Sequence, residues 1–186
     1  KIRPDATMGY EACLQALEHP ATAMGNVGAG TGATVGKLCG MERASKTGIG
    51  CYAMALGELQ VAAVVVVNAL GDIFDPANGT KIAGLMNEDR TVFGDSCEEL
   101  WKLGCPQNLF TGNTTIGAVI TNGQFNKAQM NKIASMTRNA YARCINPVGT
   151  MADGDSIYAA SAGEVEADLN VAGTLAAYVM ERAIVA

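Results

Sequence analysis

The chain has 186 residues, of which 49% are hydrophobic and 17% charged, with a formal net charge of −5. This composition is that of a packed globular domain with a sizeable core, and it excludes a disordered chain. The net negative charge also argues against nucleic acid or an anionic membrane as the main partner.

A helix is expected first, over residues 5–18. Asp5 is a suitable N-cap, and its apolar face would be Tyr10, Cys13, Leu14 and Leu17. The helix should end at His19, because a residue that precedes a proline, here Pro20, avoids the helical region. His19 is the only histidine in the sequence. Its expected place at a helix end argues against Ser-His-Asp and Cys-His catalysis.

A glycine-rich segment, residues 25–37, comes next and ends in Lys37. Repeated glycine indicates a backbone with unusual dihedral angles or a close approach to other atoms. A Walker A loop is disfavoured, since Thr31 and Leu38 stand where that motif needs Gly and Ser or Thr. The loose dinucleotide pattern at 28–33 has no clear strand before it and no good helix after it. A structural glycine loop is the alternative to a functional one, and no nucleotide cofactor is expected.

Two apolar runs, 49–56 and 59–70, predict a β-hairpin around Gly57-Glu58, a two-residue turn with glycine first. Residues 61–67 are so uniformly apolar that they predict a strand buried on both faces, and they are far too few to span a membrane. Asn68 follows directly. A polar amide at the end of a buried strand needs hydrogen-bond partners or a functional role.

The pattern weakens over residues 71–112, and a segment this long without clear elements is typically functional or mobile. Residues 114–121 predict another strand, rich in β-branched side chains. Asn126 and Gln129 predict a capping pair at the start of a helix. The apolar stripe of that helix would be Met130, Ile133, Ala134, Thr137, Ala140, Tyr141 and Cys144.

A strand is predicted over residues 156–161, and Asn170 is expected to cap a last helix. Strands flanked by helices predict one α/β domain over residues 1–186, in which helical layers cover sheets. The six cysteines form no C-x-x-C pair, which argues against a zinc site. Cys13 and Cys144 are expected to be buried free thiols, which favours a cytoplasmic location.

The first candidate for chemistry is Asn113-Thr114, within the segment that begins at Thr111 and runs into a strand. If the Thr114 hydroxyl attacks the Asn113 carbonyl, an ester forms, water cleaves it, and Thr114 becomes a new N-terminus. A free α-amine has a pKa near about 8, so it can accept the proton of the hydroxyl on the same residue. The alternative is that these residues only begin a strand.

The second candidate is Asp153-Gly154-Asp155, which precedes a predicted strand. Such a pair can bind a metal, hold a protonated amine or orient a hydroxyl. A metal is disfavoured, because Ser156 is the one further ligand nearby in the segment. A solvated Asp-Gly turn is the alternative.

Several segments together resemble the P1 peptidase family, which comprises L-aminopeptidase/D-esterases and nylon-oligomer hydrolases. The glycine-rich stretch with its lysine is the most specific of them, and the resemblance covers essentially the whole chain. The segments are residues 3–10, 25–37, 64–72, 113–119, 153–155 and 168–170.

The resemblance implies a four-layer αββα sandwich, similar to N-terminal-nucleophile hydrolases, and self-cleavage between residues 113 and 114. It implies Thr114 as the nucleophile, Asn68 as a group that helps to hold the oxyanion, and Lys37 as a nearby positive charge. The acidic pair of the family matches Asp153 and Asp155, which would orient the Thr114 hydroxyl and amine.

Asn113 before the threonine, and the Asp-x-Asp form of the pair, look more like nylon-oligomer hydrolases than like the serine-bearing aminopeptidases. Family members also carry a substantial region, with an active-site tyrosine, before the part that matches Arg3-Pro4-Asp5. We therefore expect that upstream segment of the same protein as a partner, together with a homo-oligomer.

The function implied is hydrolysis of amide bonds in small peptides, amino-acid amides or esters, or ω-amino acid oligomers, without metal or cofactor. An acyltransferase similar to the ornithine acetyltransferases is one alternative. An uncleaved, non-catalytic homologue is the other.

Overall fold

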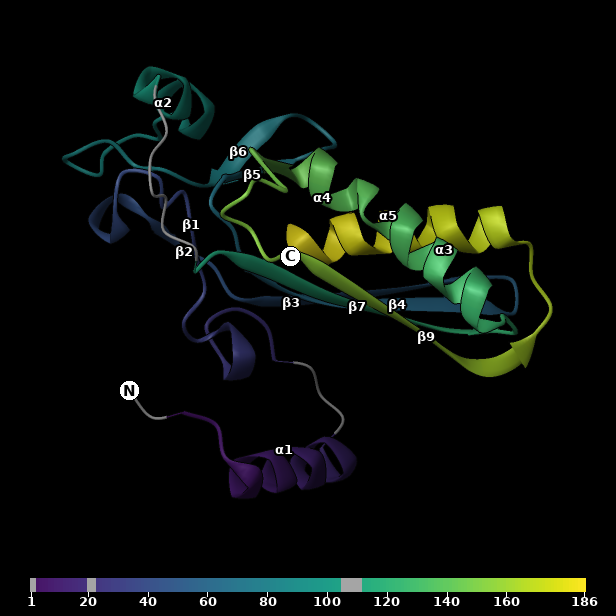
Figure 1. Ribbon diagram of the computed structural model, residues 1–186. Coiled ribbons are helices and arrows are strands. Elements are labelled where there is room, and N and C mark those ends of the chain that lie inside the picture. The colour runs from purple at the N-terminus through teal and green to yellow at the C-terminus, as the bar shows by residue number, and fades with distance from the viewer. Residues whose placement is uncertain (1–2, 20–22, 105–111) are drawn as a thin grey trace.

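The computed structural model describes residues 3–19, 23–104 and 112–186, so Pro20, Cys105 and Thr111 lie outside the described residues. Its centre is a four-stranded sheet in the order β3-β4-β7-β9 (Figure 1). These strands are β3 (Ile49–Leu56), β4 (Leu59–Asn68), β7 (Thr114–Gly123) and β9 (Ser156–Val165).

The register of this sheet brings three chain segments to one edge. β3 and β4 form the expected hairpin around Gly57-Glu58, with Gly57 at a φ of 61°. β4 and β7 are antiparallel, so that Asn68, the last residue of β4, pairs with Thr114, the first of β7. β9 runs parallel to β7 and pairs Ser156 with Ile116, so β9 begins at this same edge.

Helices cover one face of the sheet (Figure 1). They are α3 (Lys127–Thr137), α4 (Asn139–Cys144) and α5 (Leu169–Ile184). Successive side chains of a strand point to opposite faces. Accordingly Val61, Val65 and Val67 of β4 are buried in one core cluster with Val179 and Met180 of α5. The mixed α/β class is confirmed. The described residues show one helical layer on one large sheet, and the four-layer αββα arrangement stays a prediction.

The prediction that residues 61–67 are buried on both faces is wrong. Burial alternates along β4, and every second residue is only half-buried. The cause is that the described helices lie on a single face. The opposite face of the sheet leaves large apolar side chains exposed, such as Ile116 and Ile120 of β7 and Tyr158 of β9.

Smaller elements complete the fold. Two sheets are β1 (Thr34–Val35) with β2 (Ser45–Lys46), and β5 (Asp72–Asp75) between β6 (Thr80–Ala83) and β8 (Ile145–Asn146). The remaining elements are the 3₁₀ turns η1 (Gly28–Gly30) and η2 (Met41–Arg43) and the helices α1 (Ala6–Glu18) and α2 (Ser96–Leu103).

Asp72 organises the segment in which the sequence pattern is weak. Its buried carboxylate accepts hydrogen bonds from Leu85 N at 2.8 Å, Ser96 Oγ at 2.6 Å and Lys81 Nζ at 2.7 Å. Since a buried carboxylate is stable only when it is paired and hydrogen-bonded, this group ties β5, β6 and the start of α2 together.

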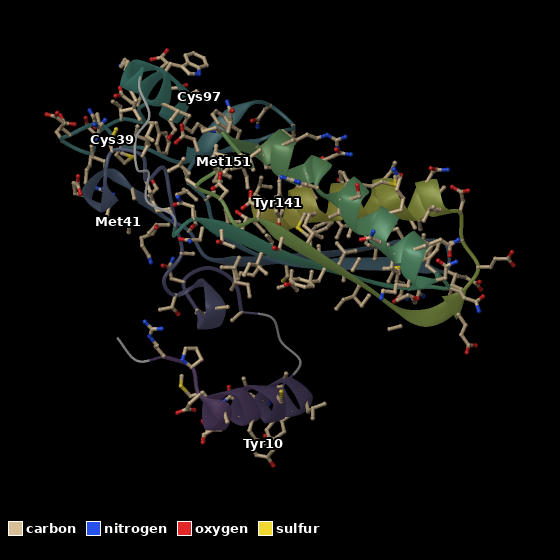
Figure 2. All side chains as sticks on the ribbon, viewed as in Figure 1. Tyr10, Cys39, Met41, Cys97, Tyr141 and Met151 are labelled. Carbon is tan, nitrogen blue, oxygen red and sulfur yellow. The ribbon has the colours of Figure 1, made fainter. Side chains whose placement is uncertain are left out.

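The first helix differs from expectation in its packing. Asp5 caps α1 as predicted, since its side chain accepts a hydrogen bond from Met8 N. The helix nevertheless buries none of its residues, and Figure 2 shows Tyr10 on the side turned away from the sheet. Cys13, which lies on this helix, is therefore exposed rather than buried, whereas Cys144 is buried as predicted.

Two other boundaries also differ. The stripe from Met130 to Cys144 is divided between α3 and α4 at Arg138, while the capping box of Asn126 and Gln129 is confirmed. The last helix is capped by Asp168, whose carboxylate accepts the N–H groups of Asn170 and Val171. The expectation that Asn170 is the cap is wrong, because Asp168 holds the extended conformation of an N-cap and the helix has already begun at Asn170.

Candidate functional site

The edge where β4 ends and β7 begins gathers every site residue that the sequence predicts. Thr114 pairs with the last residue of β4, and an isolated parallel bridge joins Asn113 to Asp153 ahead of β9. The glycine-rich segment reaches the same place from β1. The residues that meet there are Lys37, Asn68, Asn113, Thr114, Asp153 and Asp155.

The peptide bond between Asn113 and Thr114 is held tightly at its carbonyl. Thr114 Oγ1 donates a hydrogen bond to the Asn113 carbonyl oxygen at 2.5 Å, and Gly154 N donates to the same oxygen at 2.9 Å. Asn113 is fully buried, and its Nδ2 donates to Ala152 O at 3.3 Å. A hydroxyl therefore lies against a carbonyl that is fixed in place and polarised by a second donor.

Lys37 and Asn68 form the next part of the site. Lys37 Nζ donates to Asn68 Oδ1 at 2.9 Å and to Asn68 O at 3.1 Å. Asn68 Nδ2 donates to Gly112 O at 3.0 Å. Lys37 is only 5% exposed, and its burial lowers the pKa to about 8 against an opposing effect of the Asp153 charge. A buried ammonium group with a pKa this close to neutral is typical of functional sites.

The glycine-rich segment holds Lys37 in this position. Gly36 N donates to Gly71 O at 3.0 Å, and Lys37 N donates to Leu70 O at 3.2 Å. Gly36 has a φ of 66°, and a Cβ at this position would lie 1.9 Å from Leu85 N. Only glycine fits there, so this close approach explains at least part of the glycine content that the sequence shows.

The carboxylates of Asp153 and Asp155 accept hydrogen bonds from backbone N–H groups. Asp153 Oδ1 accepts Leu70 N at 3.4 Å, and Asp153 Oδ2 accepts Thr150 N at 3.0 Å and Thr150 Oγ1 at 2.7 Å. Asp155 Oδ1 accepts the N–H of Thr115, the residue after the candidate nucleophile, at 2.8 Å. Among the described residues, neither carboxylate hydrogen-bonds to the Thr114 hydroxyl.

Two polar atoms beside Thr114 are buried without a hydrogen-bond partner among the described residues, namely Thr115 Oγ1 and Asp155 Oδ2. Burial raises the pKa of Asp155, while the hydrogen bond from Thr115 N lowers it. A hydrogen bond with the backbone of Gly149 also contributes to lowering the pKa of Asp155. A buried carboxylate oxygen that accepts no hydrogen bond costs stability.

Sequence reasoning missed three contributors, Gly154, Thr150 and Tyr141. Tyr141 lies between the helices and the sheet (Figure 2) and its hydroxyl donates to Ser156 O at 3.3 Å. Burial raises the pKa of Tyr141 well above its ordinary value, so the hydroxyl remains a donor. In the sequence this tyrosine is one member of an apolar helical stripe, and nothing distinguishes it from a core residue.

In the part of the chain that the structure describes, no group of three or more His, Cys, Asp or Glu side chains is placed to hold a metal ion. None of the helices formed by these described residues has the length and apolar composition that a membrane span requires.

Comparison with curated proteins gives relatives that are about twice as long as this chain. An uncharacterized aminopeptidase of Mycobacterium leprae is 34% identical over 175 residues, which cover 89% of this chain and 46% of the relative. A 6-aminohexanoate-oligomer endohydrolase of Agromyces sp. strain KY5R is 32% identical over 170 residues, with the same two coverages.

Two solved structures share the fold. A protein of Pyrococcus horikoshii OT3 aligns with a TM-score of 0.58 at 20% identity, over 94% of this chain and 47% of its own. The L-aminopeptidase D-Ala-esterase/amidase of Ochrobactrum anthropi, described as a variant of the Ntn hydrolase fold, aligns with a TM-score of 0.57 at 19% identity. That alignment covers 88% of this chain and 44% of the Ochrobactrum protein.

A family model described as peptidase family S58 matches residues 3–186. The match extends over nearly the whole chain, and the relatives include aminopeptidases and oligomer hydrolases of the kind that the sequence resembles. The chain belongs to peptidase family S58.

Proposed function

We propose that this chain is the nucleophile-bearing part of a self-processing amide hydrolase. Thr114 first cleaves the peptide bond that precedes it, and then attacks amide substrates as an N-terminal residue. The observation that carries the proposal is the contact of 2.5 Å between Thr114 Oγ1 and the oxygen of the buried Asn113 carbonyl. The contact keeps the hydroxyl at the carbonyl group that it attacks, and the advantage of proximity is realised when Oγ1 reaches the carbonyl carbon.

Self-cleavage needs only groups of this chain and water. Thr114 Oγ1 bonds to the Asn113 carbonyl carbon, the bond from that carbon to the Thr114 nitrogen breaks, and the hydroxyl proton ends on this nitrogen. Water then hydrolyses the ester, which leaves a carboxylate on Asn113 and restores the Thr114 hydroxyl. The new α-amine can accept the hydroxyl proton in later turnovers.

The surroundings suit that amine and its substrate. Lys37 Nζ hydrogen-bonds to Asn68, and Asn68 pairs with Thr114 across the sheet. The positive charge of Lys37 therefore disfavours protonation of the new Thr114 amine and keeps this amine neutral. Asp155 Oδ2, which accepts no hydrogen bond from the described residues, offers the amine an acceptor. In the uncut chain Asn68 Nδ2 donates to Gly112 O. We propose that this donor turns to the substrate oxyanion once the chain is cut.

We propose small peptides, amino-acid amides or linear ω-amino acid oligomers as substrates. The relatives support this class by name, since they include aminopeptidases and a 6-aminohexanoate-oligomer endohydrolase. The chain spans about half the length of these relatives. We therefore propose that a further segment of the same protein completes the substrate pocket and covers the open face of the sheet, and that the assembled protein is a homo-oligomer.

The test uses the full-length protein that contains this chain. We expect mass spectrometry to find a fragment that begins at Thr114, and we expect the cleaved protein to hydrolyse 6-aminohexanoate oligomers or aminoacyl amides. Thr114→Ala should leave the chain intact and lower amide hydrolysis by at least about 1,000-fold. Thr114→Ser should retain part of both activities, because serine keeps the hydroxyl.

Thr121→Ala is the matched control, because Thr121 is a buried threonine at the opposite end of the same strand. This variant should be cleaved like the natural sequence. If Thr114→Ala is still cleaved and active, the nucleophile lies elsewhere, and Thr115 is the next residue to test. Transfer of the acyl group to added amines in preference to water would indicate an acyltransferase instead.

A further inference from the structure

We infer that the backbone N–H of Gly154 is the oxyanion donor of the self-cleavage step, and that Gly154 is glycine because the nucleophile occupies the space of a side chain. The inference rests on the proposed function, since it concerns the same peptide bond. It assigns a role to the central residue of Asp153-Gly154-Asp155, where the sequence suggests roles only for the two acids.

The distance fits this role. Gly154 N lies 2.9 Å from the Asn113 carbonyl oxygen in the uncut chain, so this N–H already points at the atom on which charge develops. Oxyanion donors act at about 2.7–3.1 Å from the position that this oxygen takes in the transition state. Asn113 is fully buried. Such a donor is worth more in a buried site than in water, because solvent does not screen its charge.

The side chain expected to act at the oxyanion is occupied elsewhere in the uncut chain. Asn68 Nδ2 donates to Gly112 O, one residue before the carbonyl that is attacked. The uncut chain therefore uses a backbone donor for its own carbonyl, and Asn68 becomes available to substrates only after cleavage. The two reactions of one nucleophile are thus served by different donors.

The turn before Gly154 fixes the direction of its N–H. Asp153 N donates to Thr150 O at 3.1 Å, and Ala152 N donates to Thr150 Oγ1 at 3.2 Å. The Asp153 carboxylate closes the turn on Thr150 and anchors it to Leu70 N. Asp153 is thereby a positioning residue for the donor, because a fixed dipole needs no reorganisation as charge develops.

Space, and not backbone conformation, explains the glycine. The φ of Gly154 lies outside the left-handed region, so alanine could adopt this backbone. A Cβ at this position would lie 2.9 Å from Thr114 Oγ1. This distance is shorter than real Cβ contacts, so an added methyl group would displace the nucleophile from the carbonyl.

The electron count is simple. As the bond between Thr114 Oγ1 and the Asn113 carbonyl carbon forms, the π pair of the carbonyl moves onto its oxygen, where the Gly154 N–H stabilises it. The pair returns when the bond to the Thr114 nitrogen breaks. The proton of the Thr114 hydroxyl passes to that nitrogen, and the Gly154 N–H neither gains nor loses a proton, so the shift from nitrogen to oxygen needs no co-reactant.

The sharpest test replaces Gly154 by glycolic acid in the full-length protein, which turns the bond between Asp153 and residue 154 into an ester and removes only this N–H. The same replacement at Gly94 is the control, because Gly94 N makes a backbone hydrogen bond of 2.8 Å to Leu85 O away from the site. We expect the change at position 154 to slow the appearance of the fragment that begins at Thr114 by about 100-fold. The change at position 94 should slow it less than about threefold, because it removes a comparable bond outside the site.

A second pair of variants tests the space. Gly154→Ala should slow self-cleavage by about tenfold or more by displacing Thr114 Oγ1. Gly9→Ala, on the exposed helix α1, should leave the rate unchanged, since no atom lies within 4 Å of a Cβ at Gly9.

The outcomes separate this inference from the proposed function. If the natural chain is cleaved, Thr114→Ala is not, and the ester at position 154 cleaves as fast as the ester at 94, then the donor role of Gly154 is wrong and the nucleophile stands. If the natural chain is not cleaved at Thr114, both proposals fail together.

Discussion

The β4–β7 strand pair carries the same kinds of polar side chain at its two ends, but it uses them differently. At the end distant from the site, Thr121 Oγ1 donates to Gln60 O at 2.8 Å. Asn122 Oδ1 accepts Gln60 N at 2.7 Å, and Asn122 Nδ2 donates to Glu58 O at 2.9 Å. These side chains all hydrogen-bond to backbone groups. They therefore join the strands to each other, and the donors and acceptors used in this way are not free to take part in a reaction.

At the other end, the threonine and the asparagine face a reactive arrangement. Thr114 Oγ1 lies against the carbonyl of its own preceding residue, and Asn68 joins a buried lysine to Gly112. Polar atoms of Thr115 and Asp155 are buried there without partners among the described residues. A buried polar group without a partner needs an explanation, and we propose that the end of the strand pair with such groups is the functional end and the end with satisfied hydrogen bonds the structural one.

The comparison of the two ends predicts the largest effect when their asparagines, Asn68 and Asn122, are replaced. Asn68→Ala removes an oxyanion donor and leaves the Lys37 ammonium with one acceptor fewer, so amide hydrolysis should fall by about 100-fold or more. Asn122→Ala should lower the free energy of unfolding by about 1 kcal/mol and leave hydrolysis unchanged. Initial rates on an aminoacyl amide and urea unfolding measure the two effects. Equal losses of activity in both variants would break the comparison.

Lys37 gives the next effect, on the dependence of stability on pH. Its folded pKa of about 8 lies below the ordinary value of 10.5. The unfolded chain therefore binds more protons between these two values, so the free energy of unfolding should rise with pH across that window. The full rise should be about 3 kcal/mol, and below pH 8 the penalty for burying the charge is fully present.

Lys37→Met should flatten this rise, because methionine fills similar space without a charge. Urea unfolding at pH 7.5 and at pH 10 measures it, and Lys132→Met, at an exposed position on α3, is the control. If the natural chain and Lys37→Met change in stability by the same amount between these two pH values, the Lys37 charge is not buried in the folded protein. The comparison is needed because the raised pKa of the buried Cys144 thiol acts in the opposite direction.

Asp155 should show a smaller effect in which stability and activity move in opposite directions. Because burial raises its folded pKa, the folded chain binds more protons than the unfolded chain between the ordinary value and the raised one, and stability falls as pH rises through that window. Asp155→Asn keeps an acceptor for Thr115 N and removes the charge. It should unfold no more easily at pH 7, while amide hydrolysis should fall by about tenfold through loss of the partner of the amine.

Glu58→Gln makes the same chemical change at an exposed position of the distant end, and should alter neither quantity. Thermal unfolding and initial rates on the same preparations provide both measurements. If Asp155→Asn retains full activity, the free oxygen of Asp155 is a packing defect and not a position for the amine.

Much of the fold could be predicted from local sequence. The Gly57-Glu58 turn and the Asn126–Gln129 capping box depend on neighbouring residues, and both are confirmed. The burial of β4 could not be predicted, because it depends on which faces of the sheet are covered. The sequence also could not predict that Asp168, and not Asn170, caps the last helix. Both are good capping residues, and the choice depends on where the chain leaves β9 and turns into the helix.

The site divides in a similar way. The predicted residues were found through motifs, whereas their contacts come from tertiary structure. Gly154 gives no signal as a donor, because any residue except proline carries an N–H and only the fold aims it at Asn113. Asp72 lies in a stretch without periodicity, and its role appears only when distant backbone groups converge on its carboxylate.

The smallest predicted effect concerns Tyr141, which tests how far the functional end extends beneath the sheet. Its hydroxyl makes long hydrogen bonds, 3.3 Å to Ser156 O and 3.5 Å to Thr115 O. Tyr141→Phe should therefore cost about 1 kcal/mol or less and leave the rate of self-cleavage within about twofold. Thr121→Val removes a buried hydroxyl at the distant end that makes shorter hydrogen bonds, 2.8 Å to Gln60 O and 3.0 Å from Gly123 N, so it should cost more, about 1–3 kcal/mol, without slowing self-cleavage.

Thermal unfolding and timed mass spectrometry compare these two variants directly. A Tyr141→Phe protein that is at least as stable as the Thr121→Val protein but is no longer cleaved would place the Tyr141 hydroxyl in the functional end. The boundary between structural and functional hydrogen bonds would then lie beneath the sheet, and satisfied bonds alone would no longer identify a structural role.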